Sequence, residues 1–237
     1  SLKKKINQYK LYLNFKDKII KNNSNNKTSI IAEIKKASPS AGIIIENYNP
    51  VEIAQKYYKS NVTCLSVLTE EDFFLGKLDH ISDIKKKINL PILCKDFFID
   101  TFQVYLAKSY GADAILIILA GLNNDLANKI YLEASKLNMS VIVEVHTLEE
   151  ASRALNFKNA LIGINNRNLK TLKTNINTTY DIYEVLKNHN EPLISESGIQ
   201  TREEILEIEN KTKIKTFLIG ESLLKNFDQN SILSLLE

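Results

Sequence analysis

The chain has 237 residues, of which 44% are hydrophobic and 25% charged, and these proportions exclude a disordered or collagen-like protein. Its 31 basic and 28 acidic side chains leave a net charge of +3, which disfavours nucleic-acid binding through bulk charge. The longest purely apolar run, residues 114–120, is far shorter than the ~20 residues that cross a bilayer. We therefore expect no membrane-spanning helix. The length suits one large barrel as well as two small domains.

The first 28 residues are expected to form a helical extension and a linker ahead of a domain at residues 29–237. Residues 2–21 fit a basic amphipathic helix, and residues 22–28 are polar enough for a linker. We interpret the helix as a lid or cap of the domain, because its lysines are mixed with Asn and Gln. A helix that lies on a membrane surface is the alternative.

Short apolar segments rich in β-branched residues recur along the domain and predict eight strands. They cover residues 29–34, 62–68, 91–94, 114–119, 140–145, 160–164, 192–195 and 216–219. Helical segments separate them: residues 50–59 follow the cap residue Asn49 with Pro50 at the first position, and residues 147–155 begin with a Thr cap. Since no two-residue hairpin turns join the strands, we expect βα units and a parallel sheet.

Eight βα units within about 210 residues predict a (β/α)8 TIM barrel with a short N-terminal helical extension. A doubly wound open sheet is the alternative, and it typically has a glycine-rich fingerprint after its first strand. Here the first strand leads into KKASPS, with a lone Gly42 beyond, so the sequence does not favour dinucleotide binding. Cys64 and Cys94 lie in apolar stretches without metal-ligand spacing. We interpret them as core residues of a protein from a reducing compartment, and we expect a cytoplasmic location.

Charged and polar side chains stand where predicted strands one, three, five, six and seven end. In chain order they are Glu33 with Lys35, Lys95, Glu144, Asn165 with Arg167, and Glu196. The carboxyl ends of parallel barrel strands meet at one mouth, where such barrels hold their active sites. Because buried charges are costly unless paired, three carboxylates and two lysines at equivalent positions predict a site for coupled acid–base chemistry.

Glycine-containing turns follow predicted strands seven and eight. They are Ser197-Gly198 and Gly220-Glu221-Ser222. Each turn leads into a helical segment whose N–H groups can face an anion, and barrels often hold a phosphate at these two loops. The turns predict a phosphorylated substrate, with Lys35 and Arg167 as countercharges. Apolar residues near the mouth, Pro39, Phe74, Phe97 and Leu169, are either ordinary packing or a slot for an aromatic ring.

The chain resembles the indole-3-glycerol phosphate synthase family in seven motifs that occur in the family's order and spacing. They are IIAEIKKASPSAG at 30–42, LSVLTEEDFFLG at 65–76, PILCKDFFID at 91–100, VIVEVHTLEE at 141–150, LIGINNRNLKT at 161–171, LISESGI at 193–199 and LIGESL at 218–223. The resemblance implies ring closure of 1-(2-carboxyphenylamino)-1-deoxyribulose 5-phosphate, with loss of CO2 and water, to indole-3-glycerol phosphate in tryptophan biosynthesis. It implies neither a metal nor an organic cofactor. The implied partner is the phosphorylated substrate, not nucleic acid or a membrane, and other enzymes of the pathway stay open as partners.

The resemblance also implies roles for individual residues. Lys95 is the implied general acid at the ribulose carbonyl, Glu144 acts in the dehydration, and Lys35 pairs with the substrate's carboxylate or phosphate. The residues implied to hold the lysines and the substrate hydroxyls are Glu33, Asn165 and Glu196. The implied phosphate site is Arg167, Ser197, Gly198, Gly220 and Glu221, the last through its backbone N–H. The implied anthranilate slot is Pro39, Phe74, Phe97, Leu116 and Leu169.

Two departures and two alternatives accompany this resemblance. Many members have Lys where this chain has Ala41 and Asp where it has Asn168, so we expect altered loop electrostatics and turnover. The nearest alternative is another phosphate-binding barrel such as phosphoribosylanthranilate isomerase, but that enzyme would be expected to use a Cys and an Asp, and Cys64 lies mid-strand. The other alternative is a non-catalytic barrel that binds phosphorylated ligands. The lysines beside carboxylates at the strand ends argue against it.

Overall fold

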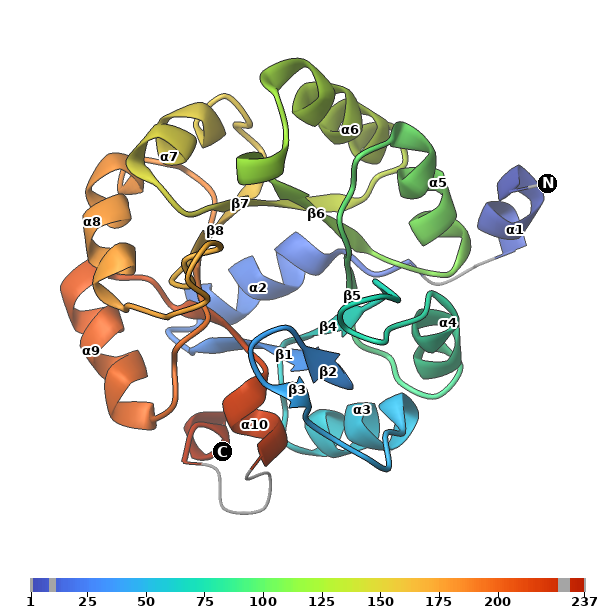
Figure 1. Cartoon of the computed structure of the whole chain (residues 1–237), viewed down its shortest axis with the longest axis horizontal. Coiled ribbons are helices and arrows are strands. Elements are labelled where there is room, and N and C mark those ends of the chain that lie inside the picture. The colour runs from blue at the N-terminus through green and yellow to red at the C-terminus, as the bar shows by residue number, and fades with distance from the viewer. Residues whose placement is uncertain (1, 9–11, 226–230, 237) are drawn as a thin grey trace.

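A closed barrel of eight parallel strands forms the body of the protein (Figure 1). The structure is a computed structural model, and it describes residues 2–8, 12–225 and 231–236. Around the barrel the strands follow the order β1-β10-β9-β8-β7-β6-β5-β4. They are β1 (Ser29–Ile34), β4 (Cys64–Leu68), β5 (Ile92–Lys95), β6 (Ala114–Ile118), β7 (Ser140–Val145), β8 (Leu161–Asn165), β9 (Leu193–Glu196) and β10 (Thr216–Ile219). The predicted TIM barrel is confirmed, and the doubly wound alternative is wrong.

Three strands begin and end one residue later than the apolar pattern predicts. Pro91 and Pro192 precede β5 and β9 because proline has no N–H to donate to the ladder, although both carbonyls still accept from a neighbouring strand. At the other end, Lys95, Asn165 and Glu196 are the last residues of β5, β8 and β9. The sheet therefore holds these three polar residues in register with their neighbours.

Helices follow the barrel strands and cover the outside of the sheet (Figure 1). They are α3 (Pro50–Lys59), α4 (Asp79–Lys85), α5 (Thr101–Ser109), α6 (Asn124–Lys136), α7 (Leu148–Ala154), α8 (Asn177–Leu186), α9 (Arg202–Thr212) and α10 (Glu221–Lys225), with 3-10 turns η1 (Leu119–Gly121) and η3 (Leu233–Leu236). The two helices singled out above are confirmed: the Asn49 side chain accepts from the first turn of α3, and Thr147 caps α7 in the same way.

The N-terminal region contains two helices, α1 (Leu2–Gln8) and α2 (Phe15–Ser24), so the expectation of one helix over residues 2–21 is wrong. Residues 9–11 of that expected helix lie outside the described part of the chain. Asn14 is extended and its side chain accepts from the backbone N–H of Asp17, which starts a new helix there. Because α2 runs to Ser24, the connection to β1 is shorter than the linker expected over residues 22–28.

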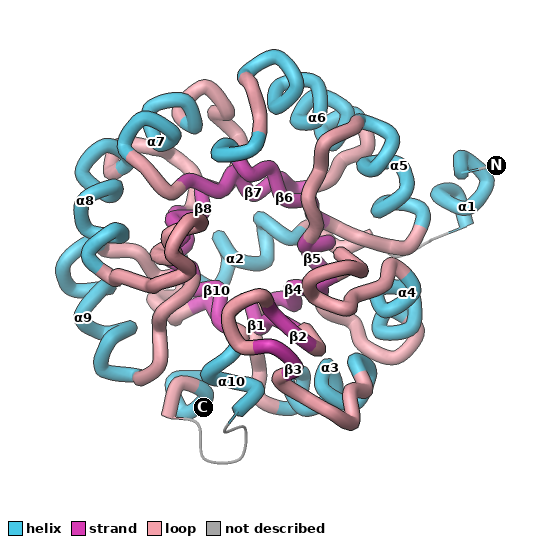
Figure 2. The backbone as a smooth tube through the Cα atoms, viewed as in Figure 1, coloured by secondary structure: helices cyan, strands magenta, loops and turns pink. Residues whose placement is uncertain are grey.

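Helix α2 closes the N-terminal end of the barrel. Its side chains Phe15 and Ile19 are fully buried in one cluster with inward-facing residues of the strands, including Ile31 and Leu93. Figure 2 shows α2 across the barrel opening, behind the strands. Of the two roles proposed for this region, α2 is therefore a cap, at the end opposite the carboxyl ends of the strands, and its buried residues Phe15 and Ile19 are unavailable to a membrane surface. No helix in the described part of the chain is long and apolar enough to span a bilayer.

Candidate active site

Lys95 lies at the centre of the charged residues that end the strands. Its Nζ is 2.9 Å from Oε2 of Glu196, 3.3 Å from Oε2 of Glu144 and 3.9 Å from Oε2 of Glu33. These side chains come from β5, β9, β7 and β1, and they meet because the carboxyl ends of parallel strands converge. Lys35, one residue beyond β1, pairs with the other oxygen of Glu33. The structure thus brings together all five charges predicted to share the mouth.

Burial and ion pairing have opposite effects on the pKa values of the charged groups in this cluster. Burial alone would lower the pKa of Lys95, but Glu196, Glu144 and Glu33 outweigh it and raise that pKa. Burial would raise the pKa of Glu33, but Lys35 and Lys95 together hold it below its ordinary value. Lys95 is therefore held as an ammonium group at neutral pH, which is the form a general acid needs.

Two neighbouring carboxylates, Glu144 and Glu196, differ in their protonation. For Glu144, Lys95 and His146 outweigh burial and hold the pKa far below its ordinary value. For Glu196, burial dominates over Lys95 and raises the pKa to about 7, with the negative charge of Glu144 acting in the same direction. Oε1 of Glu196 is buried without a hydrogen-bond partner among the described residues. One buried carboxylate is thus kept ionised while the other stays close to protonation.

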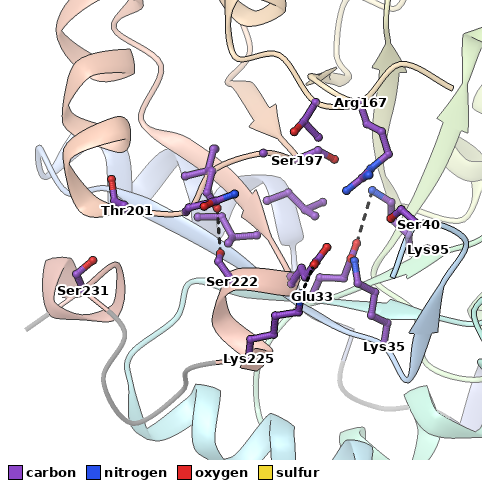
Figure 3. Close-up of a pocket in the computed structure, with 18 residues that line it drawn as sticks. Glu33, Lys35, Ser40, Lys95, Arg167, Ser197, Thr201, Ser222, Lys225 and Ser231 are labelled. Carbon is purple, nitrogen blue, oxygen red and sulfur yellow. Dashed lines mark hydrogen bonds and ion pairs between the residues drawn. The ribbon is translucent and has the colours of Figure 1, made fainter. Parts of the chain in front are cut away.

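The phosphate residues predicted from the sequence line a cavity of about 610 Å³ at the mouth (Figure 3). Its walls include Arg167, Ser197, Gly198, Gly220 and Glu221. Ser197 and Gly198 both have positive φ angles, 65° and 79°, so the turn after β9 is tightly curled. A Cβ at Gly220 would come within 2.7 Å of Oε1 of Glu33, which shows how closely this loop approaches the ion pair. The Glu221 carboxylate turns to Lys225, 2.5 Å away.

Cationic side chains reach into this cavity from the end of β5 and from the loops after β1 and β8. Figure 3 shows Arg167, Lys95 and Lys35 directed into the same space as Glu33. Arg167 lies in the loop after β8, where its Nη1 donates to the carbonyl of Leu172 at 2.7 Å. Asn165 fixes the start of that loop, since its side-chain oxygen accepts from the Arg167 backbone N–H at 3.0 Å. The cavity is therefore positively charged on one side, as an anion site requires.

The predicted apolar slot is a second cavity of about 360 Å³. The five residues assigned to it all line it: Pro39, Phe74, Phe97, Leu116 and Leu169. Phe74 and Phe97 pack against each other at an interplanar angle of 52°, with ring centroids 6.5 Å apart, and form an aromatic wall of this cavity. Pro39 reaches it from the loop between β2 (Ala37–Ser38) and β3 (Gly42–Ile43), a short hairpin after β1. These residues thus line an open cavity, and its use as a slot for an aromatic ring stays a prediction.

The two cavities are two ends of one cleft across the barrel mouth. They share the lining residues Glu33, Lys35, Ser40, Lys95, Arg167 and Ser197. One end is rich in N–H groups and cations, the other in aromatic and aliphatic side chains, and the acid–base cluster stands between them. A ligand with an anionic end and an aromatic end, joined by a polar chain, fits this order of surfaces.

Several residues of the cleft were not predicted. Ser40, Phe73, Ile118 and Leu172 line it beside predicted neighbours. Gly163 on β8 makes room for the acid–base cluster, because a Cβ there would overlap Oε1 of Glu196. His146 contacts Glu144 from behind. Residues two apart along a strand lie on the same face, so His146 shares the face of Glu144 and Gly163 shares the face of Asn165. The sequence therefore contained a signal for both residues.

Two further observations bear on the alternatives. Cys64 begins β4, at the closed end of the barrel, where its thiol lies 3.9 Å from the Phe15 carbonyl. This position is remote from the cleft. Burial also raises the pKa of the Cys64 thiol well above its ordinary value, so the thiol is poorly reactive. No group of three His, Cys, Asp or Glu side chains in the described residues is arranged to hold a metal ion.

Comparisons with known proteins identify the family of this chain. The family model described as indole-3-glycerol phosphate synthase matches residues 1–236. A protein named indole-3-glycerol phosphate synthase from Prochlorococcus marinus subsp. pastoris is 47% identical over 209 residues, covering 85% of this chain and 70% of that protein. One of the same name from Carboxydothermus hydrogenoformans is 40% identical over 228 residues, covering 96% and 86%.

Solved structures show the fold alone. Tryptophan synthase subunit alpha from Legionella pneumophila has a TM-score of 0.65 at 15% identity, over 94% of each chain. Phosphoribosylanthranilate isomerase from Thermotoga maritima has a TM-score of 0.59 at 10% identity, over 87% of this chain and 94% of that one. The sequence matches are far more specific, and with the cleft described above they show that the chain belongs to the indole-3-glycerol phosphate synthase family.

Proposed function

We propose that the cleft carries out indole-3-glycerol phosphate synthesis with Lys95 as general acid and Glu144 as the base of the dehydration. The reaction closes a ring between an aromatic carbon and the ribulose carbonyl, releases the aromatic carboxylate as CO2 and then loses water. Negative charge develops on the carbonyl oxygen during closure, so a preorganised ammonium group stabilises it and donates the proton. The observation that carries this proposal is Lys95 Nζ within 3.9 Å of three carboxylates between the two ends of the cleft.

The substrate is proposed to lie across the cleft. Its phosphate sits in the larger cavity, near Arg167 and the turns Ser197-Gly198 and Gly220-Glu221. Its anthranilate ring enters the slot beside Phe74 and Phe97, with Pro39, Leu116 and Leu169 on the other walls. This pose places the ribulose carbonyl near Lys95. Holding both ends of a flexible substrate also lowers the barrier, by up to ~7–11 kcal/mol in the best intramolecular cases.

The remaining polar residues are proposed to orient the acid and the base. Lys35 neutralises the substrate's carboxylate or phosphate while Glu33 holds it in place. Glu196 positions Lys95 through their 2.9 Å contact, and Asn165 steadies Glu144 and the substrate hydroxyls. We also propose a cytoplasmic location, which agrees with two buried, unpaired cysteines.

An activity assay tests the proposal. Purified protein with the anilino-ribulose phosphate should produce indole fluorescence, and Lys95→Ala should lower kcat by ~10²–10⁴, the usual contribution of a positioned acid. Lys211→Ala is the matched control, because that lysine pairs with Glu207 on the exposed face of α9. Well-folded wild-type protein that leaves the substrate unchanged would overturn the function and favour a ligand-binding barrel. Near-normal kcat in Lys95→Ala would remove Lys95 from its role.

A further inference from the structure

A buried amide residue, Asn166, lies directly behind the residues proposed to bind phosphate and has no part in the roles given so far. It follows the last residue of β8 and is only 2% exposed. Its backbone N–H donates to the carbonyl of Glu196, and its own carbonyl accepts from the N–H of Asn175, each at 2.9 Å. Asn166 is not among the described residues that line the cleft. Any effect of Asn166 on a ligand must therefore act through its neighbours.

Both polar atoms of the Asn166 carboxamide have two partners each. Nδ2 donates to the carbonyl of Ser197 at 3.1 Å and to Oγ of Ser195 at 3.2 Å. Oδ1 accepts from the backbone N–H of Thr179 at 3.1 Å and from its hydroxyl at 2.8 Å. A carbonyl can only accept and an N–H can only donate, so these partners fix which end of the carboxamide is which. The carboxamide is thus held in one orientation.

Two hydroxyls complete a closed ring of hydrogen bonds with the carboxamide. Oγ1 of Thr179, on α8, lies 2.8 Å from Oγ of Ser195, on β9. The Thr179 hydroxyl gives its one hydrogen to Asn166, so Ser195 donates to Thr179 and accepts from Asn166. Thr179 and Ser195 are fully buried, where a missing partner is costly. The ring therefore fixes the position of the carboxamide from two elements of the barrel.

The carboxamide holds a turn that a residue with a side chain rarely adopts. Ser197 has a φ of 65° and Gly198 a φ of 79°. Left-handed backbone at a residue other than glycine persists only where the surroundings enforce it, and the hydrogen bond from Asn166 to the Ser197 carbonyl is such a contact. Gly198 has no side chain, so it can contact a phosphate only through its main chain. The shape of the turn, and thus its fit to an anion, depends on Asn166.

Asn166 also begins the loop that carries Arg167. This loop folds back on itself, since Arg167 pairs with Thr174 in an antiparallel bridge and Asn175 donates to the Asn166 carbonyl. The loop packs on the neighbouring turn, because a Cβ at Gly198 would come within 3.0 Å of the Thr174 Cβ. Arg167 and the turn are two walls of the same cavity. Asn166 is therefore bonded to both of the loops that form these walls.

We propose that Asn166 is the positioning residue of the phosphate site. Its carboxamide holds the Ser197-Gly198 turn and the Arg167 loop in the arrangement that binds the substrate's phosphate, and Thr179 and Ser195 orient the carboxamide. This inference rests on the proposed function, because that function assigns the phosphate to these two loops. Affinity for phosphate then depends on buried groups that never touch the ligand, since they order both loops before the ligand arrives.

The test compares Asn166→Asp and Thr179→Val with a matched control. Asn166→Asp keeps the shape of the side chain but loses the N–H groups that hold Ser197. Thr179→Val removes one hydroxyl, and Thr179→Ser is the conservative variant that keeps it. Thr212→Val is the control, because Thr212 is as deeply buried and its hydroxyl donates to the Ile208 carbonyl within α9, away from the cleft residues.

Steady-state kinetics with inorganic phosphate as a competing inhibitor give the readout. In Asn166→Asp we expect KM and the inhibition constant of phosphate to rise about tenfold or more, while kcat changes much less. In Thr179→Val both constants should rise about three- to tenfold, and in Thr179→Ser they should stay within twofold of wild type. Thr212→Val should lower thermal stability and leave both constants unchanged. A general loosening of the barrel would lower kcat as well and would not produce this split.

The possible outcomes separate the inference from the proposed function. Both constants within twofold of wild type in Asn166→Asp and Thr179→Val, or an equal rise in Thr212→Val, would overturn the role of Asn166. If Asn166→Asp does not fold, Thr179→Val and Thr179→Ser decide the question. Active wild-type protein that inorganic phosphate does not inhibit would overturn the phosphate site and, with it, the inference. Inactive wild-type protein would instead overturn the proposed function.

Discussion

The two ends of the barrel each bury lysine and carboxylate side chains, but they satisfy them differently. At the closed end, Asp113 pairs with Lys85 and also accepts from the backbone N–H groups of Leu13 and Ile92, each at 2.8 Å. At the open end, one lysine, Lys95, is shared among three carboxylates, and Oε1 of Glu196 has no partner among the described residues.

The closed end is arranged for stability, whereas the open end is arranged for proton transfer. A buried ion pair whose remaining hydrogen-bond positions are filled is rigid and contributes to one unique packing. A cluster with fewer protons than acceptors keeps its groups poised to exchange a proton, at a cost in stability that the rest of the fold offsets. The closed end, which Phe15 and Ile19 of α2 seal, thus contributes to stability, and the open, polar mouth is free to carry the reactive groups.

The largest expected effect is on catalysis at the open end. Glu144→Gln keeps the shape of the side chain but cannot accept a proton, so we expect kcat to fall by ~10²–10⁴ with little change in thermal stability. Because dehydration is the step affected, CO2 should still be released in a single turnover with enzyme in excess, while indole fluorescence stays low. Both signals falling together would instead mean that Glu144 acts in ring closure.

The next largest effect is on stability at the closed end. Lys85→Met removes one partner of a buried pair and leaves the Asp113 charge uncompensated, which typically costs about 3–5 kcal/mol. Urea unfolding should show this loss, while kcat at a temperature where the variant is folded stays within twofold of wild type. A large fall in the kcat of Lys85→Met would show that the closed end also affects catalysis.

A smaller effect is expected for the phosphate end of the cleft. Arg167→Ala removes a guanidinium that lines the cavity, and hydrogen bonds to charged groups contribute about 1.5–3 kcal/mol. We expect KM to rise by about 10- to 100-fold with kcat changed much less, measured by steady-state kinetics. Lys225→Ala, which lines the same cavity but pairs with Glu221, is the comparison. An unchanged KM in Arg167→Ala would show that the phosphate binds elsewhere.

The smallest effect concerns the packing of Glu196. Gly163→Ala adds a methyl group that would overlap Oε1 of Glu196, and overpacking of this kind typically costs about 1–3 kcal/mol. We expect a decrease of that size in unfolding free energy, together with a lower kcat because Glu196 shifts away from Lys95. Gly121→Ala, where the added methyl group meets nothing within 4 Å, is the control. Equal kcat in both variants would show that the position of Glu196 has no effect on catalysis.

Much of the fold and cleft could be predicted because it depends on local patterns. Continuous apolar runs separated by capped helices are enough for a parallel barrel, and polar residues at strand ends are brought together by the topology itself. Lys95, Glu144 and Glu196 were found in this way. The close approach of Gly163 to Glu196 and the place of α2 could not be assigned from such patterns, because each depends on a contact between segments distant in sequence. His146, by contrast, lies only two residues after Glu144 and could have been found from the period of the strand.

By itself, the sequence determined the eight strands, the charges at their ends, the glycine turns of the proposed phosphate site and the resemblance to one family. Only the tertiary structure decided how these charges pair, since the distances between β1, β5, β7 and β9 follow from closure of the barrel. It also decided that α2 seals the end opposite the cleft and that His146 contacts the back of Glu144. Periodicity specifies which face a side chain lies on, whereas its pKa and its partners depend on what the closed barrel packs around it.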